Sequence, residues 1–173
     1  MTITVSKHVD KAPDSFAHSI SISAPISGKV KSLATSNEAL MAMRACGDGV
    51  CVDVSGSQLF APFEASVIQS TATGETTVLK ARSGLILRLG FASSVHQLMG
   101  ERFRRHVSVG DRVAPQQCIM DFDLAFLRNH LPQVELYVTV LNGGKLRAIT
   151  TPGGPQTSIA VVANSDDLMT LFF

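Results

Sequence analysis

Histidine and cysteine are the side chains in this sequence that could act as nucleophiles or metal ligands near neutral pH. The chain holds five histidines and three cysteines. A neutral imidazole is a good nucleophile near pH 7, and it is also a common metal ligand. One of these histidines, His96, follows directly on a glycine-containing hairpin region, residues 61–95. The other histidines are expected on the surface; they are His8, His18, His106 and His130.

The cysteines do not form a pattern that binds metal or builds a disulfide framework. Cys46, Cys51 and Cys118 are odd in number and have no tight pairing spacing. No other residues in the sequence have the spacing of a metal-ligand cluster. We therefore expect free, buried thiols in a reducing compartment, with no metal and no cofactor.

The composition limits the classes of protein to be considered. The chain has 173 residues, 45% of them hydrophobic, and a formal net charge of +1. That is enough chain for one domain with a real core. No apolar run approaches the ~20 residues that span a bilayer, and residues 1–19 lack the apolar core of a signal peptide. These features predict a cytoplasmic protein without membrane insertion, and the dispersed charge gives no sign of nucleic-acid binding.

The central hairpin has a loop at either side that could carry a site. Residues 76–80 and 85–89 are short strand-like runs, and Gly84 supplies the turn between them because it has no Cβ to clash at positive φ. The flanking loops are residues 71–75 and 90–94. Elsewhere, Asp48 and Asp111 sit in glycine-containing turns, where an aspartate typically bonds its own backbone.

Many short strands with turn signals every 8–12 residues predict an all-β fold, an antiparallel sandwich or barrel. Short helices are expected at residues 38–44 and 124–130, and a helical turn within 95–103. The absence of alternating strand and helix patterns argues against a parallel α/β sheet. We divide the chain into a flexible N-terminal segment (1–18), the β-domain (19–164) and a C-terminal tail (165–173).

The turn at residues 24–28 (APISG) resembles the turn at 61–65 (APFEA), which suggests a duplicated hairpin. With four further motifs in the same order, these turns make the chain resemble the glucose-type enzyme IIA of the bacterial sugar phosphotransferase system. The resemblance covers about residues 22–163. The other motifs are Gly47-Asp48-Gly49, Ser83-Gly84, Gly100-Glu101-Arg102-Phe103 and Val109-Gly110-Asp111-Arg112-Val113.

The resemblance implies a flattened antiparallel β-sandwich of the duplicated-hybrid-motif type. Members of this family carry a phosphoryl group on histidine, which they take from the carrier protein HPr and pass to the IIB domain of a sugar permease. Two histidines face each other in a shallow apolar depression. One belongs to a Thr-x-His motif before the central hairpin, and the other ends the second strand of the hairpin.

This chain departs from that pattern at both histidines. Thr73 keeps the threonine of the first motif, but Glu75 stands at the histidine position. Gly90 stands at the second histidine position, and Ser94 replaces the aspartate that follows it in the family. Glu75 repels phosphate and Gly90 has no side chain, so neither replaces the imidazole pair.

The resemblance also assigns a face for docking partner proteins, which is only partly apolar here. Apolar family positions have become polar at Thr71, Arg88 and His96. His96 is an alternative phosphoryl acceptor with Glu75 as its orienting group, or else an exposed histidine without a role. The apolar positions that are retained are Leu40, Met41, Ala45 and Cys46.

Three functions follow as alternatives. The first is a protein-binding or regulatory module that carries no phosphate, with HPr, a permease IIB domain, or a regulated enzyme or permease as partner. The second is an active phosphocarrier in sugar uptake that uses His96. The third is a structural module whose face mediates self-association.

Overall fold

The chain folds into antiparallel strands connected by turns and short helices. The computed structural model describes residues 5–173. The helical segments are η1 (Leu33–Thr35), α1 (Ala39–Ala42), η2 (Ser93–Leu98), α2 (Leu124–His130) and η3 (Gly143–Lys145). The strands are β1 (Ser19–Ser23), β2 (Gly28–Ser32), β3 (Asp48–Val54), β4 (Gln58–Phe60), β5 (Ala65–Ser70), β6 (Thr76–Ala81), β7 (Ile86–Phe91), β8 (Phe103–Arg105), β9 (Arg112–Val113), β10 (Cys118–Phe122), β11 (Glu135–Val140), β12 (Ala148–Thr150), β13 (Ile159–Val161) and β14 (Asp167–Phe172).

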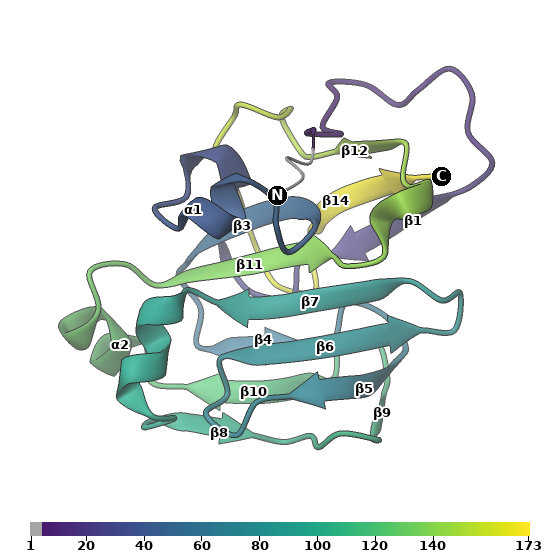
Figure 1. Ribbon diagram of the computed structural model, residues 1–173. Coiled ribbons are helices and arrows are strands. Elements are labelled where there is room, and N and C mark those ends of the chain that lie inside the picture. The colour runs from purple at the N-terminus through teal and green to yellow at the C-terminus, as the bar shows by residue number, and fades with distance from the viewer. Residues whose placement is uncertain (1–4) are drawn as a thin grey trace.

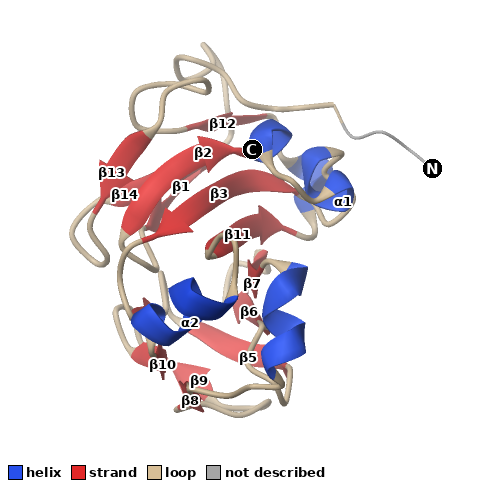
Figure 2. Cartoon of the chain, turned by 90° about the vertical axis from the view of Figure 1, so that its left-hand side faces the viewer, coloured by secondary structure: helices blue, strands red, loops and turns tan. Residues whose placement is uncertain are grey.

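One long sheet and two short sheets enclose the core (Figure 1). The long sheet is eight-stranded, in the order β13-β2-β3-β11-β7-β6-β5-β9. The short sheets are β4-β10-β8 and β1-β14-β12. Figure 2 shows the long sheet curving, with β10 and β8 near its β5–β9 end and β1 and β14 near its β13–β2 end. All pairings between named strands are antiparallel, which confirms the predicted antiparallel β-sandwich.

The strand order repeats itself, as the paired turns suggested. The half β13-β2-β3-β11 of the long sheet matches the half β9-β5-β6-β7, and the two short sheets match each other. Ala24 and Ala61 occupy equivalent places, each bonding through both N–H and C=O to a bend. The bends contain Asn164 and Gln116, which both have positive φ, 62° and 66°. The predicted duplication is thus visible in the strand order and the backbone hydrogen bonds.

The core is built by strand alternation, because successive side chains of a strand point to opposite faces. In β7, Leu87 and Leu89 are fully buried and belong to the large cluster between the sheets. Arg88 and Gly90 therefore lie on the other face of the long sheet. This outer face has a smaller cluster of its own, composed of Leu33, Met41, Cys51, Ala92 and Tyr137.

The short helices agree with the sequence patterns that predicted them. The helix α2 has the predicted bounds, and its N-terminus is capped by Asp123, whose side chain accepts from the Phe126 amide at 2.9 Å. The first helix is shorter than predicted, with α1 spanning Ala39–Ala42. The turn expected within 95–103 is the 3-10 helix η2, which begins earlier, at Ser93.

The expected C-terminal tail is instead an internal strand. Residues 167–172 form β14, the central strand of a short sheet, between β1 and β12. Leu168, Met169 and Leu171 are completely buried. Burial of such side chains contributes about 1.5–3 kcal/mol each. The sequence DLMTLF lacks clean alternation of apolar and polar residues, so its pattern did not mark it as a strand.

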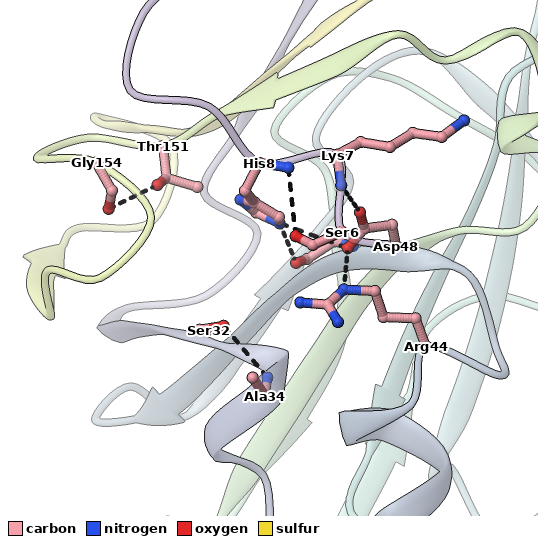
Figure 3. A network of polar contacts seen from close by, with 10 residues as sticks. Ser6, Lys7, His8, Ser32, Ala34, Arg44, Asp48, Thr151 and Gly154 are labelled. Atoms are coloured by element: carbon pink, nitrogen blue, oxygen red, sulfur yellow. Dashed lines mark hydrogen bonds and ion pairs between the residues drawn. The ribbon is translucent and has the colours of Figure 1, made fainter. Parts of the chain in front are cut away.

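The N-terminal segment is attached to the sheet through Asp48, a buried residue of β3 (Figure 3). The Asp48 carboxylate accepts hydrogen bonds from the Lys7 amide at 2.7 Å and from Arg44 Nε at 2.9 Å. It also accepts from its neighbour Gly49, as a turn aspartate would. The His8 ring lies 3.6 Å from the same carboxylate, and its side chain is only 8% exposed. The prediction that His8 is a surface residue is therefore wrong.

The other sequence-based expectations for single polar residues hold. His18, His106 and His130 are exposed, and Asp111 accepts from the nearby Ser108 amide at 2.8 Å. The expectation that the cysteines are buried is right for Cys51 and wrong for Cys46 and Cys118, which are half-buried. Residues 1–4 of the predicted flexible segment lie outside the described residues. None of the described helices has the length and apolar character needed to cross a membrane.

Candidate functional site

The candidate site lies on the outer face of the long sheet, around a row of directly paired residues. Cys51 in β3 pairs with Tyr137 in β11, Tyr137 pairs with Gly90 in β7, and Gly90 pairs with Thr76 in β6. Because paired residues of neighbouring strands share a face, this row forms a floor beneath the loops at its ends. The hairpin thereby places the loops at residues 71–75 and 90–94 beside the smaller hydrophobic cluster of the outer face.

The loop before β6 presents Glu75 toward η2. The side chain of Thr73 donates a hydrogen bond to Glu75 Oε2. The other carboxylate oxygen, Oε1, lies 3.1 Å from His96 Nδ1. Gly74 has φ +78°, and a Cβ there would come within 3.3 Å of Phe103, so the turn is suited to glycine. The sequence-based expectation that Glu75 and His96 lie near each other is met by this contact.

Glu75 and His96 differ strongly in exposure. The Glu75 side chain is 19% exposed, whereas that of His96 is 67% exposed. Partial burial raises the pKa of Glu75, but hydrogen bonds from Thr73 and His96 and attraction to His96 outweigh it, so the pKa lies below its ordinary value. Glu75 is therefore a carboxylate at neutral pH. With Nδ1 turned to this carboxylate, Nε2 is the ring nitrogen of His96 available for chemistry.

Arg88 occupies the space in which a side chain at position 90 would begin. A Cβ built on Gly90 would lie 2.3 Å from Nη1, 2.4 Å from Cζ and 2.5 Å from Nη2 of Arg88. Residues 88 and 90 share a face because they are two apart in β7. The Arg88 guanidinium thus fills the place left by the missing side chain, which sequence reasoning had not foreseen.

The Arg88 guanidinium is only partly satisfied. Its Nη2 donates to Thr76 Oγ1 at 3.3 Å. Its Nη1 is buried without a hydrogen-bond partner among residues 5–173. Thr139 pairs directly with Arg88 across β11 and β7, and its buried Oγ1 likewise lacks a partner within that range. No described carboxylate forms an ion pair with Arg88, so a positive charge with free donor capacity lies at the floor of the site.

The apolar residues that the resemblance assigns to the docking face differ in their exposure to solvent. Leu40 is 51% exposed and Ala45 is exposed, whereas Cys46 is half-buried. Met41 is buried in the smaller hydrophobic cluster of the outer face and supports this surface from beneath. Thr71 and Ser94 are half-buried at the rim.

Two features of this surface have no signal in the sequence, namely one exposed apolar side chain and one long-range hydrogen bond. Met99, which follows η2 with φ 51°, is 72% exposed. The Glu38 side chain accepts a hydrogen bond from the Ser93 amide, which connects the α1 region to the start of η2. The contact joins residues 55 positions apart, so no local pattern announces it.

Comparison with known proteins gives consistent results. Residues 20–146 match the model of the family described as phosphoenolpyruvate-dependent sugar phosphotransferase system, EIIA 1. The glucose-specific EIIA component of the same system from Bacillus cereus is 26% identical over 148 residues, covering 86% of this chain and 87% of that protein. The corresponding protein from Bacillus anthracis is 26% identical over 133 residues, covering 77% and 81%.

A solved structure shows the same fold. Glucose permease IIA from Mycoplasma capricolum superposes with a TM-score of 0.76, covering 88% of this chain and 96% of that one at 17% identity. At this identity the likeness concerns the fold alone. The family match spans most of the chain, and so this protein belongs to the EIIA 1 family of the phosphoenolpyruvate-dependent sugar phosphotransferase system.

Proposed function

We propose that this EIIA family member is a protein-binding or regulatory module that carries no phosphoryl group. The observation that carries this proposal is the Arg88 guanidinium over Gly90, at the position that the resemblance assigns to the second histidine. The other assigned histidine position is Glu75, a carboxylate held ionised by Thr73 and His96. An imidazole pair is thereby replaced by an arginine and a carboxylate.

The chemistry of phosphoryl transfer explains why this replacement matters. The acceptor must be a neutral nucleophile, and its partner must stabilise the phosphoryl oxygens. A guanidinium stays protonated and cannot attack phosphorus. A carboxylate repels the approaching phosphate. The site is suited instead to contact a charged group on another protein, because Glu75 is partly exposed and retains its charge beside the Arg88 guanidinium.

The partners we propose are proteins of the phosphotransferase system, namely HPr or a permease IIB domain, or an enzyme or permease under its control. Exposed Leu40 and Met99 provide apolar contact area, Glu75 and Arg88 provide charge, and His96 provides an exposed polar ring. Interfaces of this kind combine apolar anchors with charged groups that set specificity. We also propose that the protein acts in the cytoplasm.

The first test is phosphoryl transfer. With phosphoenolpyruvate, enzyme I and HPr, the wild-type chain is expected to acquire no acid-labile, base-stable label, because it has no imidazole at either assigned position. A Bacillus cereus glucose-specific EIIA component in the same mixture serves as the positive control. Label on the wild-type chain would contradict the binding-only proposal.

One observation favours a second candidate, an active phosphocarrier that uses His96. Glu75 Oε1 lies 3.1 Å from His96 Nδ1, which orients the ring and leaves Nε2 for in-line attack. This candidate predicts label on the wild-type chain and its loss in His96→Ala. Label that persists in His96→Ala would exclude both candidates, since it would require another acceptor.

The binding proposal includes a fixed signalling state. Family partners distinguish a neutral face from a phosphorylated one, and Glu75 gives this face a permanent charge of about −1, against −1.5 to −2 for a phosphate monoester. We expect Glu75→Gln to weaken the complex with HPr or the IIB domain by about 1 kcal/mol or more, as when a charged interface contact is truncated. Isothermal titration calorimetry of wild type, Glu75→Gln and Arg88→Phe measures this loss of binding affinity.

Matched controls separate recognition of the site from general charge effects. Glu64→Gln removes a carboxylate from the exposed Glu64–Arg112 pair at the other edge of the sheet. Arg82→Ala removes an exposed guanidinium from the far turn of the same hairpin. Both should leave the affinity unchanged. Equal affinities for wild type and Glu75→Gln would mean that the charge of Glu75 carries no signal.

A further inference from the structure

Three side chains that can bind a metal ion meet at the short sheet β4-β10-β8. None of them belongs to the positions that the resemblance assigns to phosphoryl transfer. One ligand atom each of His106, Cys118 and Asp121 lies within 4.8 Å of the others. His106 Nε2 is 2.6 Å from Asp121 Oδ1, and Cys118 Sγ is 3.7 Å from the same oxygen. Among residues 5–173 this is the group of three that converges in this way.

An irregularity in β10 brings two of these side chains together. Residues three apart in a regular strand point to opposite faces, so Cys118 and Asp121 would diverge. The pairing of β10 with β4 shifts register between Cys118 and Met120. Such a bulge inserts one residue and re-aims the side chains on either side of it. Cys118 and Asp121 therefore converge on one face.

The third ligand is supplied by the neighbouring strand. His106 directly follows β8, and its amide donates to the Ile119 carbonyl at 3.0 Å, which fixes the chain beside β10. The ring then reaches Asp121 across the pair. Gln58 of β4 supports the group from the other side, with Nε2 3.9 Å from Cys118 Sγ.

The donor set has a defined chemical preference. A thiolate, an imidazole and a carboxylate together suit Zn²⁺, a borderline-soft ion that accepts sulfur, nitrogen and oxygen ligands in a tetrahedron. Thiolate and carboxylate together would neutralise the charge of the ion. The His106 and Asp121 side chains are 33% and 37% exposed, so solvent can reach a fourth position.

We propose that His106, Cys118 and Asp121 form a Zn²⁺ site with one position open to water or a further ligand. Binding requires the Cys118 thiol to release its proton to solvent and His106 to bind as neutral imidazole. The contact between His106 and Asp121 opens from 2.6 Å toward about 3.4 Å, the separation of two ligands at tetrahedral zinc. Both side chains are exposed enough to make that rotation.

Cobalt is the probe that reads the thiolate directly. The full-length chain, stripped with chelator, is titrated with Co²⁺ while the near-ultraviolet thiolate-to-cobalt absorption and the visible bands are recorded. We expect one equivalent to bind with a thiolate band, and added Zn²⁺ to displace it. Cys118→Ser should abolish the thiolate band. His106→Gln should weaken binding at least about tenfold, the smallest loss reported for removing even a supporting partner of a ligand.

Controls keep the test specific to this group. Cys46→Ser removes another half-buried thiol, and His96→Ala removes the histidine that contacts Glu75. Both should bind Co²⁺ as wild type does. Far-ultraviolet circular dichroism of each metal-free variant checks folding. If Cys118→Ser does not fold, the Co²⁺ affinity of His106→Gln is the deciding measurement. Absence of the band in wild type, its persistence in Cys118→Ser, or its loss in Cys46→Ser would overturn the proposal.

Discussion

A variant carrying Glu75→His, Gly90→His and Arg88→Phe is expected to accept a phosphoryl group from HPr, whereas the wild-type chain is expected to accept none. The two histidines restore the imidazole pair that the family resemblance implies. The third change removes the guanidinium whose atoms lie 2.3–2.5 Å from a Cβ at position 90. The surrounding sheet is already the family fold, so the change concerns the reacting groups alone.

The double variant Glu75→His with Gly90→His is the matched control, because it keeps Arg88. The guanidinium must then move aside or displace the new imidazole. A misplacement of about 1 Å can cost about 10²-fold in rate, so labelling of the double variant should be slower than that of the triple variant by about that factor. Labelling is measured with radioactive phosphoenolpyruvate, enzyme I and HPr, and stability toward base identifies phosphohistidine.

The outcome also separates two explanations for the absence of labelling that we expect of the wild-type chain. If the triple variant is labelled, the loss of transfer lies in residues 75, 88 and 90. If a well-folded triple variant is not labelled, the docking of HPr has been lost as well, and Thr71 and His96 become the residues to restore. An equal rate in double and triple variants would show that Arg88 does not obstruct position 90.

Replacement of Asp48 by alanine is expected to lower the free energy of unfolding by about 3–5 kcal/mol, the usual cost of leaving one partner of a buried ion pair alone. The Asp48 side chain is 3% exposed, and it holds the Lys7 amide, Arg44 Nε and the His8 ring (Figure 3). Arg44 has φ 56°, a strained value that this contact helps to hold. Urea denaturation at pH 7 measures the loss.

The effect of Asp48 should depend on pH with a definite sign. Burial raises the pKa of Asp48, but the close contact with the His8 ring and the hydrogen bond from the Lys7 amide outweigh it, and the folded-state pKa lies below the ordinary value of 3.8. A depressed carboxyl pKa stabilises the folded state above the unfolded pKa and loses that contribution as the pH falls through the folded pKa. The difference between wild type and Asp48→Ala should therefore be largest above pH 3.8 and should narrow as the pH falls below that value.

Asp53 provides the control on the same strand. It belongs to β3 as Asp48 does, but its side chain is exposed. Asp53→Ala should change the free energy of unfolding by less than about 1 kcal/mol, as expected for exposed charges. Equal losses for the two variants would show that the buried network contributes nothing of its own.

Local pattern was enough to predict the strands of the central hairpin, because alternation is a property of successive residues. Leu87 and Leu89 alternate with Arg88, and Gly84 marks the turn, so strand and turn could be located without tertiary contacts. The helix α2 was predicted with its observed bounds, and the structure adds that Asp123 caps it. The turns at Ala24 and Ala61 predicted the duplication, because their similar sequences can be recognised without tertiary contacts.

Other features have no local signal, because their partners are distant in sequence. β14 is buried only because β1 and β12 lie on either side of it. His8 is buried because Asp48, in a different strand, accepts its contact. Residues His106 and Cys118 are twelve apart in sequence, and their ligand atoms meet only through strand register and a bulge.

The sequence by itself determined the fold family of this protein, because the motif residues can be seen directly in the order of the chain. It also led to the prediction that Glu75 and Gly90 stand at the two histidine positions of the family. The family resemblance also predicted that His96 lies near Glu75, and the two side chains are in contact. Only the tertiary structure decided what fills the vacated space. Arg88 can extend in several rotamers, and its position over Gly90 depends on packing against Thr76 and on the strands paired at either side. Side-chain direction within a strand is local, but the place where a long side chain ends is set by its neighbours across the sheet.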